Sequence, residues 1–205
     1  MRAPQTVEPS QEIAMKTCLA VVIPALLVAG CATTSTAPSA APAHTASIGV
    51  ATPMVGNATI ALAAASGSLV SGRLSAMAMT DGVHITGDVG GLAPGSTHGL
   101  HVHEKGDCSA ADASSAGPHF NPAGTAHGNP QAGTHHAGDL PNITAGSDGV
   151  AHVNVHVSGM TLGGAASSNI IGRALVVHAA ADDYTSQPAG NSGARVACGV
   201  IRAGG

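Results

Sequence analysis

From residue 57 onward, short apolar segments alternate with turns rich in glycine and small polar residues. The segment 150–157 is the clearest, because apolar residues at every second position alternate with mostly polar ones, the period of a strand with one buried face. Seven segments fit strands: 59–64, 68–79, 83–89, 98–104, 150–157, 174–178 and 196–201. The segment 139–144 is a candidate for an eighth strand. Short strands at this spacing predict an all-β, antiparallel sandwich or barrel.

The turns between these segments are of two kinds. Asp81-Gly82 and Asp148-Gly149 are short hairpin signals. By contrast, 106–137 and 179–194 are long and rich in glycine, proline and small polar residues, so neither fits a strand. Long loops in a compact domain are usually functional, and both of these border a set of histidines.

The first 56 residues lack this strand pattern. Residues 1–14 are polar, and we expect Met15 to be the true start, with 15–30 forming a signal peptide whose apolar run is too short to span a bilayer. The run ends in VAGC at Cys31, which resembles the lipobox of bacterial lipoproteins, where the cysteine becomes acylated. The alternative is an ordinary secretory signal with an incidental cysteine. Residues 31–56, mostly Ala, Thr, Ser and Pro, predict a flexible tether, so the domain begins at 57.

Composition narrows the functional classes. The net charge is −4 and the only aromatic residues are Phe120 and Tyr184, so the core must be built from aliphatic side chains. Lysine and arginine do not cluster, which argues against nucleic-acid binding, because that requires a basic face. Membrane contact is expected only through the lipid anchor.

Cysteine use agrees with export. The predicted domain contains only Cys108 and Cys198, and two cysteines in an exported domain most simply form one disulfide. Two unpaired buried thiols are the alternative. A disulfide of this kind stabilises the fold by at most about 4–5 kcal/mol in the chain-entropy model.

Histidines carry the candidate chemistry. His101 and His103 lie two apart in a predicted strand, so both side chains point to one face and can bind one ion. His178 ends another predicted strand, and a third imidazole makes a nitrogen-rich site suited to copper or zinc. His98 lies on the opposite face of a regular strand and is not counted as a ligand.

A second set of possible ligands lies in the first long loop. His119, His127, His136 and Asp139 match the composition of a closed tetrahedral zinc site. The alternatives are a surface loop in a histidine-rich protein, and His135 in place of His136, although the interval from His127 favours His136. Together the two sets exceed one tetrahedral site, which suggests two ions side by side.

Four motifs resemble copper/zinc superoxide dismutase: HGLHVHE at 98–104, GPHFNP at 117–122, GRALVVH at 172–178 and GNSGARVACGVI at 190–201. The likeness covers 57–203 and includes the intervals between motifs. KGDC at 105–108 and ADDY at 181–184 resemble the exported bacterial branch. The resemblance implies a Greek-key β-sandwich or flattened barrel.

The resemblance also implies one copper and one zinc ion per subunit. Copper would be bound by His101, His103, His119 and His178, and zinc by His119, His127, His136 and Asp139. His119 would bridge the two ions, so that seven residues make eight ligand contacts. Asp182 would orient His101 and His127, as histidine ligands generally require. Cys108 and Cys198 match the family disulfide.

Arg195 matches the family's arginine at the mouth of the copper channel, where its permanent charge can hold a small anion. Because the net charge is negative, steering of superoxide must come from the local field of Arg195, with Lys105 as a further contributor. The 179–194 loop contains no lysine and has Ala189 where the family often has a hydroxyl-bearing residue.

The sequence therefore predicts an exported copper/zinc superoxide dismutase, a monomer or homodimer, that protects the cell envelope from the periplasmic side. Copper would be alternately reduced and reoxidised as superoxide becomes oxygen and hydrogen peroxide, with His119 supplying a proton and zinc playing a structural part. Two other classes are a module that stores or delivers metal without turnover and an adhesin-like sandwich with accidental histidines.

Overall fold

A computed structural model describes residues 52–204, which form nine β-strands and one short 3₁₀ helix, η1 (Ser114–Ala116). The strands are β1 (Asn57–Ala64), β2 (Ser71–Ala78), β3 (Gly82–Gly90), β4 (Thr97–His98), β5 (Leu100–His103), β6 (Ile143–Thr144), β7 (Ala151–Ser158), β8 (Ala174–His178) and β9 (Arg195–Ala203). No α-helix occurs within this part of the chain, and no helix there is long and apolar enough to cross a bilayer.

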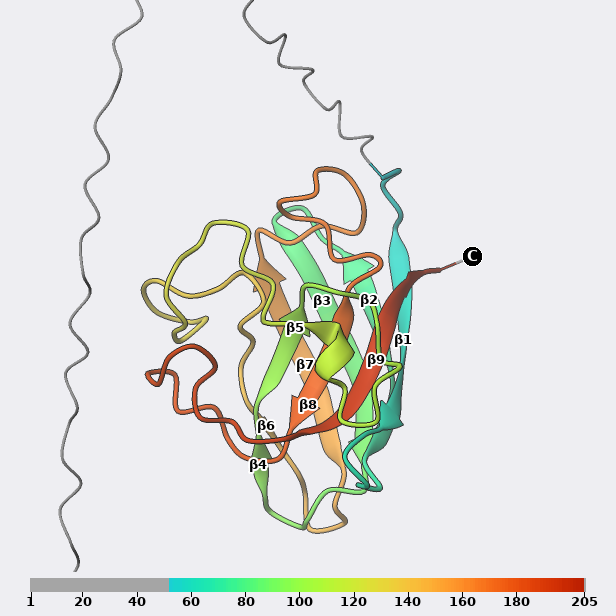
Figure 1. The fold of residues 1–205 in the computed structure, drawn as a ribbon. Helices are drawn as coiled ribbons and strands as arrows, with labels where there is room; N and C mark the ends of the chain where they lie inside the picture. Colours follow the sequence, from blue (N-terminus) through green and yellow to red (C-terminus); the bar gives the residue numbers. More distant parts are fainter. Residues whose placement is uncertain (1–51, 205) are drawn as a thin grey trace, which may run out of the picture. The chain divides into compact units, whose positions relative to one another are not determined.

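Seven strands form one antiparallel sheet in the order β5-β8-β9-β1-β2-β3-β7, while β4 pairs with β6. The sheet curls around a single main core, to which all seven strands contribute buried side chains such as Ile60, Ile85 and Leu175. In Figure 1, β5, β8 and β9 pass in front of β3 and β7. The non-sequential strand order and the curl confirm the predicted Greek-key β-sandwich.

Burial patterns explain which strands carry the candidate site. β7 alternates strictly between buried and exposed residues, as the sequence predicts for a strand with one face in solvent. β5 and β8 are buried on both faces. The second face of β5 carries His101 and His103, which are 0% and 1% exposed. A strand face can bury histidines only if other segments cover it and satisfy their nitrogens.

Several predicted boundaries change for identifiable reasons. The expected strand 98–104 is divided at Gly99, whose N–H donates to the carbonyl of Ala180 and whose Cβ, if added, would lie 3.0 Å from the Cβ of Ser192. The expected strand 68–79 begins only at Ser71, because Ser66 and Gly67 form a turn with positive φ angles and the Ser68 hydroxyl donates to the distant carbonyl of Val196. Of 139–144, only β6 is a strand.

The two hairpin signals have different outcomes. Asp81-Gly82 joins β2 to its antiparallel neighbour β3, as expected. Asp148-Gly149 also forms a turn, in which the Gly149 N–H donates to the carbonyl of Gly146, but it joins no hairpin because β6 pairs with β4 rather than with β7.

The N-terminal boundary is earlier than expected. Thr52 forms a β-bridge with Gly164, and the Val55 N–H donates to the carbonyl of Leu162, so residues 52–56 lie against the domain rather than extending from it. The expectations for residues 1–14, the signal peptide at 15–30, and Cys31 with most of the tether fall outside the described residues.

Candidate metal centre

The first cluster, here called the strand group, consists of His101, His103, His119 and His178. β5 and β8 pair directly, which places the imidazoles of His101 and His103 beside that of His178 at the end of β8. His119 joins them from the first long loop through a β-bridge with His103. All four are buried, and one ligand atom from each lies within 4.8 Å of the others.

Hydrogen bonds select which nitrogen of each strand histidine is free. His101 Nε2–H donates to Asp182 Oδ2 at 2.7 Å, His103 Nδ1–H to the carbonyl of Gly117 at 2.7 Å, and His178 Nδ1–H to the carbonyl of Gly193 at 3.1 Å. Since one ring nitrogen of each is the donor, the other presents a lone pair to the centre of the group. The Nε2 atoms of His103 and His178 are 3.4 Å apart there.

The second cluster, here called the loop group, consists of His119, His127, His136 and Asp139. Asp139 Oδ1 lies 2.9, 3.0 and 3.3 Å from the Nδ1 atoms of His119, His127 and His136. The His119 and His136 Nδ1 atoms are 3.4 Å apart. Ligand atoms at the Zn–N distance of a tetrahedral site are about 3.3 Å apart, so these spacings fit a zinc-sized ion.

Backbone donors fix the carboxylate of the loop group. Asp139 Oδ2 accepts N–H bonds from Gly128 at 3.1 Å and His136 at 2.8 Å, which leaves Oδ1 facing the histidines. Burial alone would raise the pKa of Asp139, but hydrogen bonds from His119 and these two amides outweigh it and hold the pKa well below its usual value. The carboxylate is therefore charged and acts only as an acceptor or ligand.

The buried polar atoms that lack hydrogen-bond partners are the ones that would bind an ion. His101 Nδ1, His119 Nε2 and His127 Nδ1 are buried and have no hydrogen-bond partner among residues 52–204. A buried nitrogen without a partner is costly and rare in native proteins. The donor set thus fits a copper-type ion in the strand group and zinc in the loop group, with His119 presenting Nε2 to the first and Nδ1 to the second.

Asp182, on the second long loop, connects the two groups. Its Oδ1 accepts from His127 Nε2–H at 2.9 Å, while its Oδ2 accepts from His101. Burial raises the pKa of Asp182, but the hydrogen bonds from His101, His127 and the Tyr184 N–H together lower it. One charged carboxylate thus sets the ring orientation of one histidine in each group.

Burial keeps His101, His103 and His178 neutral. It lowers the pKa of His101 to about 4, of His103 to about 2 and of His178 to about 3, and it lowers the pKa of His136 in the loop group as well. Neutral imidazole is the form that binds metal ions. His101, His103, His136 and His178 are therefore in the neutral, metal-binding form at neutral pH.

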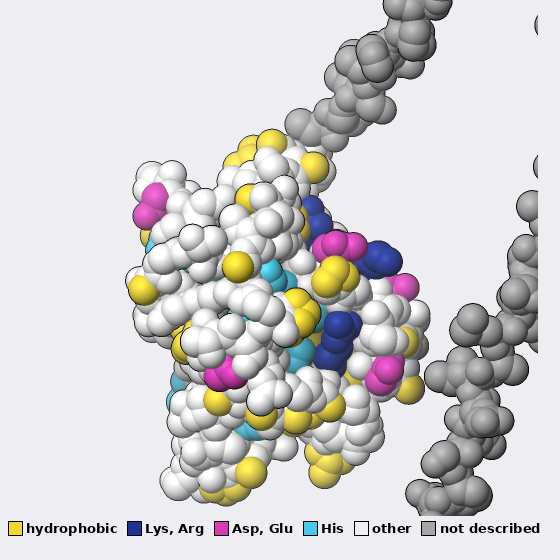
Figure 2. All heavy atoms as spheres, turned by 60° about the vertical axis from the view of Figure 1, so that its left-hand side comes forward, with side chains coloured by type: hydrophobic (Ala, Val, Ile, Leu, Met, Phe, Trp, Pro, Cys, Tyr) yellow, Lys and Arg dark blue, Asp and Glu magenta, His cyan; other side chains and the backbone are white. Residues whose placement is uncertain are grey.

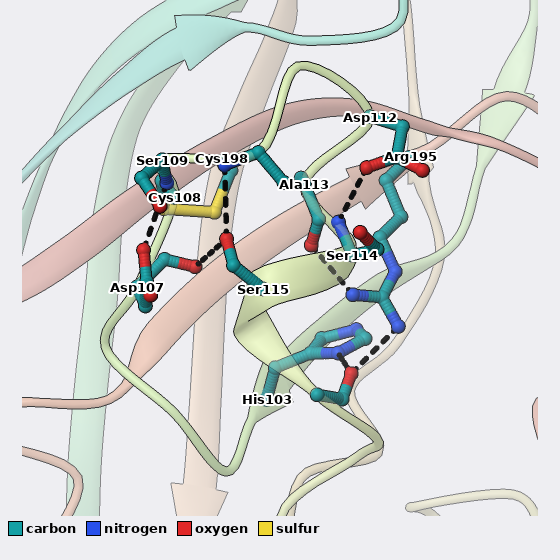
Figure 3. Close-up of a disulfide and its surroundings, with 12 residues drawn as sticks. His103, Asp107, Cys108, Ser109, Asp112, Ala113, Ser114, Ser115, Arg195 and Cys198 are labelled. Carbon is teal, nitrogen blue, oxygen red and sulfur yellow. Dashed lines mark hydrogen bonds between the residues drawn. A yellow bond between two sulfur atoms is a disulfide. The ribbon is translucent and has the colours of Figure 1, made fainter.

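Arg195, at the start of β9, is held by the loop that the disulfide anchors. Figure 3 shows the Cys108–Cys198 disulfide joining this loop to β9, and the Arg195 guanidinium donating to the carbonyl of Ala113, drawn together with His103. It also donates to the carbonyl of Gly117 at 2.6 Å, the same oxygen that accepts from His103. The predicted disulfide is thus present, and one carbonyl fixes both the arginine and a histidine of the strand group.

Arg195 and His178 line a common hollow of about 320 Å³ whose other lining residues come from the second long loop. None of these residues is acidic, and Arg195 is the one charged residue among them. Figure 2 shows histidine atoms next to a basic side chain, with acidic side chains elsewhere on the same face. A small anion entering this hollow would meet the guanidinium beside the strand group.

Several supporting groups had no clear signal in the sequence. The carbonyls of Gly117 and Gly193 are backbone acceptors, which no side-chain pattern reveals. Gln187 pairs with both backbone groups of His127, and Asn142 pairs with both backbone groups of Asp182. Gly190 lies so close to Asp182 and His127 that a Cβ would overlap both, which only its place in the 190–201 motif could suggest.

The remaining nearby histidines lie outside both groups. His98 Nδ1–H donates to the carbonyl of His178 at 2.8 Å, a structural contact. His135 points elsewhere, with its Nδ1 2.6 Å from the carbonyl of His136. The structure therefore places His136, and not His135, beside Asp139.

The two histidine groups lie side by side in this fold, share His119, and fit two metal sites. Comparison with known proteins is specific: residues 70–201 match the copper/zinc superoxide dismutase (SODC) family. The chain belongs to the copper/zinc superoxide dismutase family.

Three solved structures are similar to this chain in sequence and in fold. A double mutant of an SOD-like protein from Bacillus subtilis is 39% identical, with a TM-score of 0.63, covering 70% of this chain and 96% of that one. The SOD-like protein itself is 38% identical, with a TM-score of 0.62 and coverage of 69% and 96%. The clock protein EA4 is 37% identical, with a TM-score of 0.65 and coverage of 73% and 96%.

Proposed function

We propose that this protein is an enzyme that converts two superoxide anions and two protons to molecular oxygen and hydrogen peroxide. The observation that carries the proposal is His119, whose two ring nitrogens face two different groups of buried ligand atoms. A storage module needs a closed set of ligands. A shared imidazole beside an arginine-lined hollow suits an ion that exchanges electrons with a small anion.

In this proposal the strand group holds copper and the loop group holds zinc, one of each per subunit. The four-nitrogen strand group suits copper, and the three-nitrogen, one-carboxylate loop group suits a closed zinc site. When bound, copper supplies the one-electron redox chemistry of the reaction. The loop group supports it by holding His119 Nδ1 in place.

The residues around the ions have separate tasks. Arg195 attracts superoxide into the hollow and orients it, since its two carbonyl contacts fix the guanidinium beside His178. His119 can hold a proton at Nε2 and donate it to the reduced anion, while Asp139 and the loop group retain Nδ1. Asp182 keeps the His101 and His127 rings in the orientation that aims each Nδ1 at its ion.

We also propose that the protein works in the periplasm, anchored through a lipid on Cys31, and protects the cell envelope from superoxide. The lipobox-like VAGC and the presence of a disulfide support export to an oxidising compartment. Superoxide is the proposed substrate, nucleic acid is not a partner, and the subunit acts as a monomer or homodimer.

Pulse radiolysis of the copper- and zinc-loaded protein tests the activity. We expect superoxide decay to accelerate steeply with enzyme concentration and to slow as ionic strength rises. Arg195→Ala should reduce the rate by about tenfold or more and weaken the salt dependence. Arg202→Ala is the matched control, since Arg202 lies on the same strand but does not line the hollow, and its rate should stay close to the wild-type value.

Copper bound in the strand group without any acceleration of superoxide decay would contradict the enzyme proposal and favour a metal-storage module. An equal effect of the two arginine variants would contradict the role given to Arg195. Mass spectrometry of the exported protein tests the location, because a mature chain that does not begin with an acylated Cys31 would contradict the lipid anchor.

A further inference from the structure

Arg173, the residue before β8, lies outside both metal groups and outside the hollow that Arg195 lines. Its side chain is half-buried, and all three guanidinium nitrogens donate hydrogen bonds. The acceptors are backbone carbonyls: Nε donates to Asn169 at 2.7 Å, and Nη1 and Nη2 donate to Glu104 and Ala166 at 2.9 Å each. A planar guanidinium held at three points has a fixed orientation.

The guanidinium lies over the aromatic ring of Phe120. Its Cζ is 3.5 Å from the ring centroid, within the range of a cation–π contact, which is stronger where water is excluded. Phe120 is 3% exposed and belongs to the main core. The ring is therefore fixed by the core and by the guanidinium together.

Phe120 follows His119, and its backbone joins the segments that carry the ligands. Its N–H donates to the carbonyl of Val102 at 2.8 Å, and its carbonyl accepts from the Gly138 N–H at 2.8 Å. Val102 separates the two histidines of β5, and Gly138 precedes Asp139. A Cβ added at Gly138 would lie 2.2 Å from the Val102 carbonyl oxygen, so the segments are closely packed. The position of Phe120 therefore affects ligands of both groups.

Arg173 also supports the residue on the other side of His119. The Glu104 carbonyl accepts from Arg173, while the Glu104 N–H donates to the carbonyl of Pro118 at 3.0 Å. Both neighbours of His119 are thus connected to one guanidinium, Phe120 directly and Pro118 through Glu104. Because His119 belongs to both groups, a small displacement of its backbone would misplace both of its ring nitrogens.

We propose that Arg173 is a positioning residue for His119, and that its guanidinium sets the geometry of both metal groups through Phe120 and Glu104. Arg173 does not line the hollow, so its effect reaches the site through the backbone of 118–120. The inference deepens the function proposed above and rests on it for any effect on rate, whereas the effect on metal binding needs no turnover. The alternative is a purely structural role, in which Arg173 only anchors the loop before β8.

Electron paramagnetic resonance and chelator competition on the copper- and zinc-loaded protein test this role. Arg173→Met keeps an unbranched side chain but removes the charge and all three donors. We expect a changed copper(II) hyperfine splitting and a zinc affinity about 10–100-fold lower, as for other residues that support metal ligands. Arg173→Lys keeps the charge but not the planar fork, so it should shift both quantities in the same direction by less. Arg202→Met is the matched control, since Arg202 is exposed on β9 and lies in neither metal group, and it should match the wild type.

Phe120→Leu tests the route of the effect. If Arg173 acts through the aromatic ring, Phe120→Leu should reproduce the spectral change. Adding Arg173→Met to it should then lower the zinc affinity by less than the product of the two single effects, because both substitutions remove the same contact. Losses that multiply in full would contradict this route. Circular dichroism identifies the variants that are folded.

The proposal is wrong if folded Arg173→Met has lower thermal stability but the wild-type spectrum and zinc affinity, because a mere anchor has this effect. It is also wrong if Arg202→Met changes the spectrum as much. Where Arg173→Met does not fold, Arg173→Lys decides by the same two measurements. A wild-type protein that binds both ions without accelerating superoxide decay would contradict the proposed function alone, and the two metal measurements would still decide the role of Arg173.

Discussion

The strand group and the loop group hold their ligands by different physical means. His101, His103 and His178 stand on β5 and β8, where the ladder register sets the distance between their side chains. His127 and His136 lie in a long loop with no ladder, and their positions depend on Asp139, Asp182 and Gln187. The strand group is thus built by the sheet, whereas the loop group is built by hydrogen bonds.

This difference predicts unequal tolerance to change. Losing a supporting hydrogen bond should disturb the strand group little, because the sheet still aims its imidazoles. The same loss should lower both the metal affinity and the local order of the loop group, because there metal binding is coupled to folding of the loop. His119 is the exception, because it belongs to both.

The largest effect should come from His119→Ala. Removing this imidazole takes one ligand from each group and leaves Asp139 without one of its buried partners. We expect superoxide dismutation to be abolished and zinc binding to be lost, while some copper is retained by the three remaining strand histidines. Metal analysis and pulse radiolysis check this; full zinc affinity with wild-type activity would contradict the shared-ligand assignment.

A smaller and asymmetric effect should follow Asp182→Asn. An amide cannot accept from both His101 Nε2–H and His127 Nε2–H, because only one of its two ends is an acceptor. We expect metal affinity to fall about 10–100-fold, more for zinc than for copper, because strand register still positions His101. Competition against chelators of known affinity measures each ion separately.

The matched control is Asp183→Asn. Asp183 is the neighbouring carboxylate, and among residues 52–204 its side chain accepts hydrogen bonds only from Thr185 and Ser186 of its own loop. Its substitution should leave both affinities close to the wild type. Equal losses of copper and zinc in Asp182→Asn would mean that register does not protect the strand group.

A further effect should be a pH dependence of stability in the metal-free protein. Burial lowers the pKa of His101, His103 and His178 in the folded state, whereas in the unfolded chain they take up protons near pH 6.5. Below about pH 6.5 the unfolded state therefore binds more protons, so stability falls with falling pH. The loss from His101 continues to about pH 4, where the folded form also protonates.

Denaturant unfolding of the chelator-treated protein between pH 7.5 and pH 4.5 measures this slope. His178→Gln should reduce it more than His136→Gln, because burial lowers the pKa of His178 to about 3 and His136 is less strongly affected. A greater reduction in His136→Gln would show that the loop group dominates the titration.

The strands could be predicted where the apolar residues follow a regular alternation or an unbroken run. β7 and β8 follow the expected segments closely, because alternation or a continuous apolar run with β-branched residues leaves few other conformations. The break at Gly99 and the late start of β2 could not be predicted, since both depend on contacts with distant residues such as Ala180 and Val196. Long-range contacts leave no periodic signal.

The seven clustered residues could be identified from the sequence because metal ligands must be specific side chains. What orients them could be identified only in part. Asp182 could be identified because it lies in a motif. The acceptors at Gly117 and Gly193 could not, because they are backbone carbonyls and every residue of any chain has one. The pairing of Gln187 with His127 joins residues 60 positions apart and has no local pattern.

The sequence by itself determined the chemistry: which side chains can bind ions, which strands can form, and which two cysteines can pair. These depend on residue type and on short-range periodicity, both of which are written along the chain. Only the tertiary structure decided that one carbonyl of Gly117 fixes both His103 and Arg195, and that Gln187 holds both backbone groups of His127. Such facts depend on register and on loop closure, where a shift of one residue would turn a ligand to the other face of the sheet.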